Sequence, residues 1–412
     1  MKVSLLTLGC RVNQSETAVI EGTLKESGIT IVNLNENPDY CIVNTCTVTA
    51  KSDYNSRQLI RRAARAGAKV IVTGCYAQLR PDEVGSLKGV SNIVSNHRKS
   101  EIVRIITDKE TDLYYGTYSL SRPYLKIQDG CNFKCSYCSV PLARGRSKSV
   151  PEEEVVERAR IIEAGGYREI VLTGIHLGTY GHDLGGGENL NGLLKRILAN
   201  TQSCRIRLSS LEINEIDDEL MEIMQERRMC NHLHIPLQSG SDKLLKLMRR
   251  HYTADFYARR LRTIVSRVEA VSLGTDIITG FPGEGEAEFS ETLTYIKDLP
   301  FSYLHVFPFS GRPDTEAFLM KNRPLPGIVR ERIEKMKTLN SFKKSSYMKN
   351  LIGKTVEIIL EEQSGKNAFI GTSSNYLKIL LSCSGYKMGS IVPVRLTDIE
   401  NGMLRGVVIR ST

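Results

Sequence analysis

The chain has no apolar run long enough to cross a membrane. A membrane-spanning helix needs roughly 20 consecutive apolar residues, and no stretch of the sequence approaches that length. Residues 1–10 (MKVSLLTLGC) faintly resemble a lipoprotein signal, but their apolar part is too short for a signal core of about 7–15 residues. We therefore predict that this segment is a first β-strand, and we expect a cytoplasmic protein.

Internal repeats and low-complexity segments are also absent. Hydrophobic residues form 41% and charged residues 25% of the 412 residues, which is typical of globular proteins. At about 150 residues per domain, a chain of this length forms two or three domains. The formal net charge of +10 suits a polyanionic partner such as nucleic acid, although charge alone does not identify one.

The cysteines say more about chemistry than the overall composition does. Ten of them are scattered along the chain without a secretion signal. In that setting cysteines more often bind metals or take part in catalysis than form disulfides. The ten are Cys10, Cys41, Cys46, Cys75, Cys131, Cys135, Cys138, Cys204, Cys230 and Cys383.

Three of the cysteines form a dense C-x3-C-x2-C motif at residues 131–138 (CNFKCSYC). A four-iron cluster takes four thiolates, so three local thiolates hold three irons and leave the fourth open for chemistry. The alternative is a structural zinc knuckle or three unrelated buried cysteines. Zinc sites usually fill four protein ligands, and no fourth Cys or His follows at short spacing, since the next histidine is His176. The spacing resembles the signature of the radical S-adenosylmethionine (SAM) enzymes.

Residues 1–118 alternate between predicted strands and helices, as in an α/β domain with a doubly wound parallel sheet. Short apolar runs predict the strands, and helical spacing of apolar residues predicts the helices, the first with Ser15 as its cap. The predicted strands are 2–8, 30–34, 41–45 and 69–73, and the predicted helices are 14–27 and 52–66.

Cys10, Cys46 and Cys75 each follow the carboxyl end of a predicted strand. Ligand sites in open parallel sheets lie at that edge, and neighbouring strands are about 4.8 Å apart. If the first, third and fourth strands are neighbours, the three thiols can bind one group; otherwise three cysteines end three strands by chance. Cys41 lies roughly 16 Å from Cys46 along the same strand and is expected to be an ordinary buried residue.

Residues 119–345 contain six predicted strands, most of them followed by a predicted helix. Eight β/α units close a full barrel, so six predict a partial barrel with its site on the carboxyl-end loops. The predicted strands are 124–128, 169–173, 205–209, 232–236, 273–279 and 303–307, and the predicted helices are 151–164, 189–199, 216–227, 241–268 and 286–298.

Four of the loops that follow these strands carry glycine or polar residues. Glycine at such a position lets the backbone approach a cofactor. The loops are 173–178 (TGIHLG), 208–212 (LSSLE), 237–241 (LQSGS) and 276–284 (DIITGFPGE).

Basic and histidine residues lie near these loops in the sequence. Residues 248–252 (MRRHY), with Arg144 and Arg146, form either a phosphate-binding group or a solvated face. We interpret His176 and His251 as hydrogen-bonding or packing residues rather than catalytic bases.

Residues 321–346 predict a basic linker helix, and the strands that follow it predict a separate small domain at 346–412. About five short strands with glycine turns suggest a small antiparallel β-barrel, like an oligonucleotide-binding fold. The predicted strands are 355–360, 368–372, 377–381, 391–396 and 403–409.

Three amino-terminal segments make a family resemblance specific: 7–14 (TLGCRVNQ), 44–48 (NTCTV) and 73–78 (TGCYAQ). Together with the four loops above, they look like the motifs of the methylthiotransferases, and this resemblance covers essentially the whole chain. It implies SAM and two 4Fe–4S clusters as cofactors. By the same resemblance, Cys131, Cys135 and Cys138 hold the cluster that cleaves SAM, and Cys10, Cys46 and Cys75 hold an auxiliary cluster.

The resemblance also implies a SAM pocket and an RNA-binding appendage. Glu212 could instead pair with a nearby arginine, and Asp276 could be a structural carboxylate. The last domain resembles a TRAM domain at residues 354–357, Tyr376, Arg395 and Arg405, with a purely stabilising or protein-binding barrel as the alternative. The implied pocket residues are Tyr137, placed against the adenine, with Gly174, Ser210, Glu212, Gln238 and Asp276.

Within the family, residues 7–17 (TLGCRVNQSET) look most like the MtaB subgroup. Its members convert N6-threonylcarbamoyladenosine at tRNA position 37 to the 2-methylthio derivative. One SAM donates a methyl group to sulfur, and a second SAM is cleaved to a radical that activates C2–H. The implied partners are a tRNA anticodon loop, whose base must unstack, and an electron donor such as flavodoxin or ferredoxin.

Three other functions stay open at this point. Two are methylthiolation of N6-isopentenyladenosine-37 in tRNA and methylthiolation of an aspartate on a ribosomal protein. The third is non-enzymatic: an iron–sulfur protein that binds RNA and cleaves no SAM.

Overall fold

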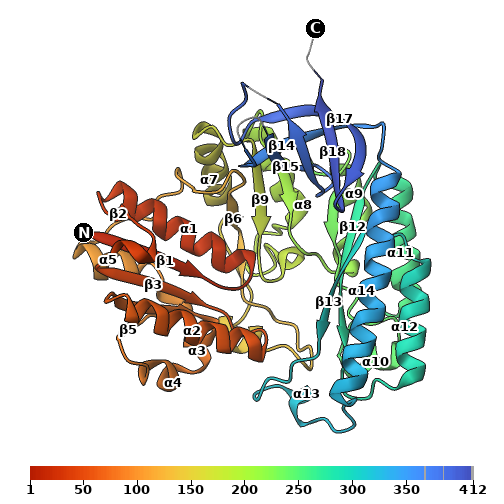
Figure 1. The fold of residues 1–412 in the computed structure, drawn as a ribbon, viewed down its shortest axis with the longest axis horizontal. Coiled ribbons are helices and arrows are strands. Elements are labelled where there is room, and N and C mark those ends of the chain that lie inside the picture. Colours follow the sequence, from red (N-terminus) through yellow and green to blue (C-terminus); the bar gives the residue numbers. More distant parts are fainter. Residues whose placement is uncertain (366–367, 384, 410–412) are drawn as a thin grey trace.

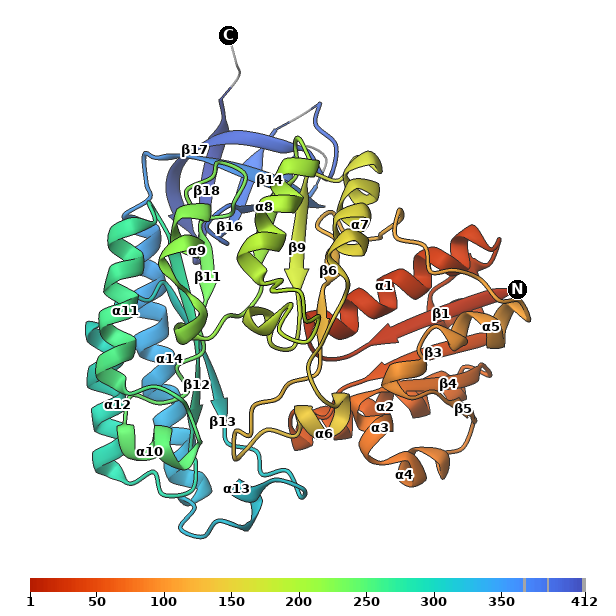
Figure 2. The same ribbon diagram turned by 180° about the vertical axis from the view of Figure 1, so that it is seen from behind.

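The computed structural model describes residues 1–365, 368–383 and 385–409. An amino-terminal sheet lies beside a central partial barrel, and a small carboxyl-terminal barrel caps one end of the central strands (Figures 1 and 2). No helix in the described part of the chain is long and apolar enough to cross a membrane.

The amino-terminal sheet is parallel, with the order β2-β1-β3-β4-β5. The first, third and fourth strands are therefore neighbours, as the cysteine positions require. Helices α1 and α5 pack on one face, and α2 packs on the other. The elements are β1 (Lys2–Thr7), α1 (Arg11–Glu26), β2 (Thr30–Ile31), β3 (Tyr40–Thr45), α2 (Ala50–Arg65), β4 (Lys69–Gly74), α3 (Cys75–Leu79), α4 (Pro81–Gly85), β5 (Val90–Ile93) and α5 (Glu101–Thr107).

Helix α1 begins earlier than predicted, and the predicted cap is wrong. Cys10 precedes the first helical residue, Arg11. Ser15 lies inside the helix, where its hydroxyl donates a hydrogen bond to the carbonyl of Tyr124 (2.7 Å). Ser15 therefore ties the amino-terminal sheet to the central barrel instead of starting a helix.

Six parallel strands form the predicted partial barrel, in two groups ordered β6-β9-β10 and β11-β12-β13. A bridge between Ser210 and His234 joins the groups. The elements of this region up to β11 are β6 (Tyr124–Lys126), β7 (Gln128–Asp129), α6 (Val140–Arg144), β8 (Lys148–Ser149), α7 (Glu152–Ala164), β9 (Glu169–Thr173), α8 (Leu190–Asn200), β10 (Arg205–Leu208), α9 (Asp218–Ile223) and β11 (His232–His234). Those that follow are α10 (Asp242–Leu247), α11 (Ala254–Arg267), β12 (Ser272–Thr279), α12 (Glu286–Asp298), β13 (Tyr303–Pro308), α13 (Glu316–Leu319) and α14 (Pro326–Lys349).

The single helix predicted over 241–268 is wrong, because the chain breaks between α10 and α11. Arg249 has a φ of +57°, in the left-handed region that ends a helix. The Thr253 hydroxyl accepts a hydrogen bond from the backbone N–H of Phe256 and caps α11. The apolar spacing continues across the break, so the pattern alone did not reveal it.

The last five strands close into the predicted barrel, with the order β14-β15-β16-β18-β17. Four pairings are antiparallel, and the pairing of β16 with β18 is parallel. The interior is apolar, with Ile358, Leu381 and Leu404 fully buried. The strands are β14 (Thr355–Gln363), β15 (Ala368–Ser373), β16 (Lys378–Ser382), β17 (Ile391–Glu400) and β18 (Met403–Val408).

The carboxyl-terminal barrel is held at the amino ends of β9 and β10 by buried charges. Glu169, the first residue of β9, pairs with Arg205 (2.6 Å) and Arg207 (2.7 Å). Arg207 also donates hydrogen bonds to the carbonyls of Ser373 and Ser374, both at 2.9 Å. The small barrel thus closes the end of the central barrel opposite the carboxyl-end loops (Figure 1).

Candidate functional site

The loop between β7 and α6 carries Cys131, Cys135 and Cys138, and polar groups surround the three thiols. Cys131 Sγ lies 3.5 Å from His176 Nδ1, and Arg250 Nη1 lies 3.6 Å from Cys135 Sγ. Burial raises the pKa of Cys138 to about 12. Buried thiols next to positive side chains are suited to bind as thiolates when a metal compensates the cost of burial.

The second triad converges as the strand order requires. Burial raises the pKa of Cys46, and the nearby thiols of Cys75 and Cys10 raise it further. A Cβ atom built on Gly9 would lie 3.0 Å from Cys46 Sγ, so the β1 and β3 loops touch. Cys41 is fully buried one strand length away, as predicted.

The thiol spacing bears on whether either triad forms a single-metal site. Three thiolates around one zinc ion lie about 3.8 Å apart, given Zn–S bonds of about 2.3 Å. Among the described residues, neither triad places all of its ligand atoms within 4.8 Å of one another. Neither set of thiols therefore has the spacing that a mononuclear zinc site requires.

A glycine makes the approach of Cys75 to Cys46 possible. Gly74 has a φ of +97°, which side-chain-bearing residues rarely adopt. A Cβ atom there would lie 2.6 Å from Asn44 Oδ1 and would also collide with the backbone of Thr45. The ends of β3 and β4 can therefore meet only if this position lacks a side chain.

A buried charge network lies between the two triads. Arg144, which is 1% exposed, pairs with Asp129 (2.8 Å) and Glu16 (3.1 Å) and donates a hydrogen bond to Asn13 (2.5 Å). Asn13 and Glu16 follow Cys10 on α1, whereas Arg144 follows the other triad on α6. Arg144 consequently fixes the two cysteine loops relative to each other. It neither binds phosphate nor lies on a solvated face, which were the two alternatives predicted from the sequence.

Arg250 has a similar internal role that the sequence did not indicate. Its guanidinium pairs with Glu212 as well as approaching Cys135. Although burial would lower it, the neighbouring Tyr252 and Glu212 hold the pKa of Arg250 well above its usual value. Glu212 therefore pairs with an arginine, which was one of the two interpretations of this residue. Arg250 is not a surface phosphate ligand.

Five of the six predicted pocket residues lie on the cysteine loop or on the carboxyl-end loops, and Asp276 lies within β12. Tyr137 packs edge-on against Phe281, with ring centroids 6.4 Å apart. Gly174 lies against Gln128, where a Cβ atom would be 2.9 Å from Oε1. The backbone N–H of Gln238 donates a hydrogen bond to the carbonyl of Asp276 (2.8 Å).

The remaining predicted pocket residues differ in exposure. Ser210 is exposed and lies beside β11. The Asp276 carboxylate contacts His234 and His305. These two histidines were not among the predicted site residues. Their spacing was a usable signal, because His232 with His234 and Tyr303 with His305 each occupy alternate positions of one strand.

His176 is a hydrogen-bonding residue, as predicted. Its Nδ1 faces Cys131 and its Nε2 pairs with Glu215. Burial alone would lower the pKa of His176, but these two partners raise it to about 10.

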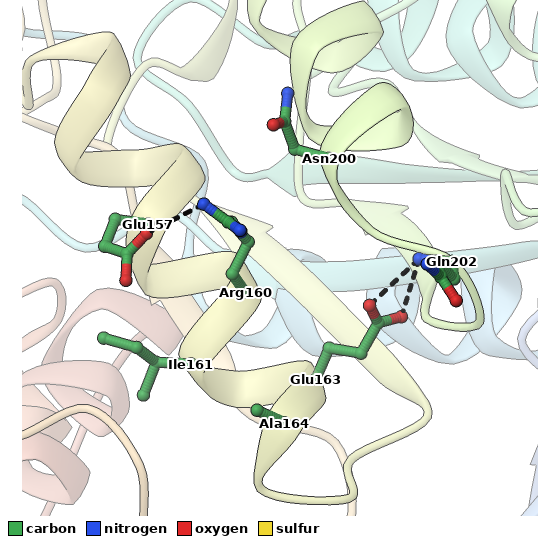
Figure 3. Close-up of a pocket in the computed structure, with 7 residues that line it drawn as sticks. All are labelled: Glu157, Arg160, Ile161, Glu163, Ala164, Asn200 and Gln202. Carbon is green, nitrogen blue, oxygen red and sulfur yellow. Dashed lines mark hydrogen bonds and ion pairs between the residues drawn. The ribbon is translucent and has the colours of Figure 1, made fainter.

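A separate hollow lies on the outer helical layer, between α7 and the end of α8 (Figure 3). Its charged side chains are occupied locally. Arg160 pairs with Glu157 (3.5 Å), and Glu163 accepts hydrogen bonds from the backbone N–H of Gln202. None of the predicted site residues lines it, so we do not assign it a function.

Comparison with known proteins first gives the class. Residues 125–296 match the model described as "Radical SAM superfamily", and residues 2–95 match "Uncharacterized protein family UPF0004". The fold is similar to that of the radical S-adenosylmethionine methyltransferase TsrM from Kitasatospora setae, with a TM-score of 0.56, 15% identity, and 77% of this chain and 76% of that chain covered. Fold and cysteine loop together define a radical SAM protein.

Full-length relatives then give the family. The chain is 37% identical to the threonylcarbamoyladenosine tRNA methylthiotransferase MtaB of Aquifex aeolicus, over 96% of this chain and 100% of that protein. It is also 37% identical to the enzyme of the same name from Bacillus subtilis, over 96% and 93% of the two chains. The chain belongs to the radical SAM methylthiotransferase family.

Proposed function

We propose that this protein methylthiolates C2 of N6-threonylcarbamoyladenosine at position 37 of tRNA. The observation that carries the proposal is the pair of cysteine triads joined by Arg144. The chain is also matched over 96% of its length by relatives that are named for this activity. Methylthiolation needs both a radical source and a sulfur carrier, and two separate metal-binding triads provide a place for each.

In this proposal, Cys131, Cys135 and Cys138 hold a 4Fe–4S cluster, and Cys10, Cys46 and Cys75 hold a second one. When bound, the first cluster supplies the electron that cleaves SAM to a 5′-deoxyadenosyl radical. Arg250 places a positive charge beside Cys135 and so stabilises its thiolate. Arg144 and Lys99 do the same for Cys75, against the burial that raises its pKa.

The SAM pocket is proposed at the carboxyl-end loops. Tyr137, Gly174, Ser210 and Gln238 border it, and Glu212 contributes through its pairing with Arg250. Asp276 uses Oδ1 for the two histidines, and its Oδ2 has no hydrogen-bond partner among the described residues.

We propose one role for each of three domains. Residues 1–118 hold the auxiliary cluster, residues 119–345 carry out the radical chemistry, and residues 346–412 bind RNA. The proposed partners are the tRNA anticodon loop and an electron donor such as flavodoxin or ferredoxin. The net charge of +10 favours an RNA substrate.

The test is anaerobic reconstitution with iron, sulfide, SAM, reductant and tRNA that carries threonylcarbamoyladenosine. Mass spectrometry of the digested nucleosides should show a new 2-methylthio product. Both Cys46→Ala and Cys135→Ala should abolish it and leave about four irons per chain in place of about eight. Cys41→Ala is the matched control, because Cys41 is buried near the start of β3, whereas Cys46 follows the end of that strand.

The outcomes separate the alternatives. SAM cleavage without a modified nucleoside would reject this substrate while keeping the radical chemistry, and isopentenyladenosine tRNA and then ribosomal protein would be tried next. Absence of SAM cleavage in a protein with full iron content would favour the non-enzymatic RNA-binding function.

A further inference from the structure

A polar wall lines the inner face of the three strands β11, β12 and β13. Successive side chains of a strand point to opposite faces of the sheet, so alternate residues share one face. Leu233, Leu273, Ile277 and Leu304 lie on the outer face and pack in the main core, which also contains Met336 of α14. The opposite face carries Ser272, Ile278 and six side chains that we name the inner wall: His232, His234, Asp276, Tyr303, His305 and Phe307.

Polar contacts connect five of the six inner-wall side chains, all except Phe307, in one continuous chain. His305 Nδ1 lies 3.3 Å from Asp276 Oδ1, and His234 Nε2 lies 3.0 Å from the same oxygen. His234 Nδ1 is 3.2 Å from the Tyr303 hydroxyl, which is 2.8 Å from His232 Nε2. Gly274 makes room for this arrangement, because a Cβ atom there would collide with the Tyr303 ring.

One arrangement of protons is consistent with every contact in this chain. His232 donates to Tyr303, Tyr303 donates to His234, and His234 donates to Asp276. His305 also donates its Nδ1 proton to Asp276, which leaves His305 Nε2 as an acceptor. Burial, and next the charge of Arg207, lower the pKa of His232 well below its usual value, in keeping with a neutral ring.

The solvent exposure of the inner-wall side chains increases from His232 to His305 and Phe307. His232 is fully buried under Tyr376, whose ring stacks on it with centroids 4.4 Å apart. At the other end, 50% of the His305 side chain is exposed, and Phe307 beside it is 45% exposed. His305 Nε2 has no hydrogen-bond partner in the described part of the chain. At this open end, the network therefore presents a free acceptor beside an exposed aromatic ring, whereas the unpartnered His232 Nδ1 at the other end is buried.

A metal ion is the other ligand that two histidines and an aspartate can hold. In a metal site, the three ligand atoms point toward a common centre. Here both imidazole nitrogens lie at hydrogen-bond distance from one carboxylate oxygen, and the hydrogen bonds to both histidines, against the effect of burial, lower the pKa of Asp276. The cluster is satisfied without an ion.

We propose that His305, oriented by Asp276 and His234, accepts a hydrogen bond from the threonylcarbamoyl group of the substrate base and so selects that substituent. The inference rests on the proposed function and adds the residue that reads the substituent. A threonylcarbamoyl group offers a hydroxyl and a urea N–H, whereas an isopentenyl group offers neither. A site that uses a fixed polar partner discriminates against a ligand that lacks the matching group.

The experiment measures binding separately from catalysis. Anticodon stem–loops with threonylcarbamoyladenosine, isopentenyladenosine or adenosine at position 37 are titrated into the purified full-length protein by fluorescence anisotropy. We expect wild type to favour the threonylcarbamoyl stem–loop about tenfold, because one well-placed hydrogen bond contributes about that factor. His305→Leu should bind all three alike, and His305→Gln, which keeps an acceptor, should restore part of the preference.

His182→Leu is the matched control, because His182 is exposed and lies on the segment between β9 and α8, outside the three strands of the inner wall. In the reconstituted enzyme, His305→Leu should raise KM for the tRNA substrate and change kcat little. An unchanged preference in His305→Leu, or a stoichiometric divalent ion that His305→Leu removes, would overturn the proposal. Failure of wild type to form the 2-methylthio product would instead reject the proposed function, so the two failures are distinguishable.

Discussion

At the scale of single residues, Arg144 shows how a charge can be fully buried between two metal-binding loops. Its guanidinium pairs with Glu16 of α1 and with Asp129 of β7. A buried ion that loses its partner is costly because its charge is left uncompensated.

We therefore expect Arg144→Met to reduce the free energy of unfolding by about 3–5 kcal/mol, measured by urea denaturation. Arg146→Met, two positions away and exposed, should change it by less than about 0.5 kcal/mol. Equal effects of the two substitutions would contradict the structural role given to Arg144.

The residues that could be predicted from the sequence are those whose position follows from local rules. Cys10, Cys46 and Cys75 could be grouped because parallel strands end at a common edge. Arg144 and Arg250 were misjudged as surface groups, because basic residues are usually exposed and the sequence does not show which carboxylates lie nearby.

At the scale of elements, the turn from β4 into α3 depends on Gly74. The positive φ and the contact with β3 act together there. Gly67 provides a comparison, since it has a φ of +81° but no atom within 4 Å of a built Cβ.

Gly67→Ala should cost only the left-handed backbone strain, about 1–2 kcal/mol, and should leave the iron content unchanged. Gly74→Ala adds a collision with the end of β3, so it should displace Cys75 and lower the iron bound after reconstitution by about half. Iron and protein assays on the two variants check this expectation, and full iron content in Gly74→Ala would refute it.

Elements with one clear period were predicted well, and those whose ends depend on tertiary contacts were not. Strands β3 and β12 follow apolar runs and were placed to within a residue. The break at Arg249 was missed because the apolar spacing continues through it. The inner wall was missed for a different reason: it appears only when the register of three strands is known.

At the scale of the whole molecule, Glu169 couples the central barrel to the carboxyl-terminal barrel. Burial would raise its pKa, but Arg207, Arg205 and Arg122 together lower it. An unfolded glutamate titrates near pH 4.3. Because the folded pKa lies below that value, the stabilisation is present above about pH 4.3 and is lost as the pH falls through the folded pKa.

Glu169→Gln should lower stability at pH 7 by about 3–5 kcal/mol, since the buried Arg205 and Arg207 lose their counter-charge. It should also flatten the loss of stability between about pH 5 and pH 3, measured by thermal unfolding across that range. The control Glu157→Gln, at an exposed pair with Arg160, should keep the wild-type pH profile. An unchanged acid profile in Glu169→Gln would contradict this assignment.

The contacts of Tyr376 affect how the last domain can be exchanged between related proteins. Its ring stacks on His232, and its hydroxyl accepts a hydrogen bond from Arg11 (2.8 Å), the neighbour of Cys10. A chimera that exchanges the last domain between relatives therefore also exchanges the ring that covers the buried end of the inner wall. Tyr376, His232 and Arg11 have to be kept together in such a chimera if the packing between the barrels is to be preserved.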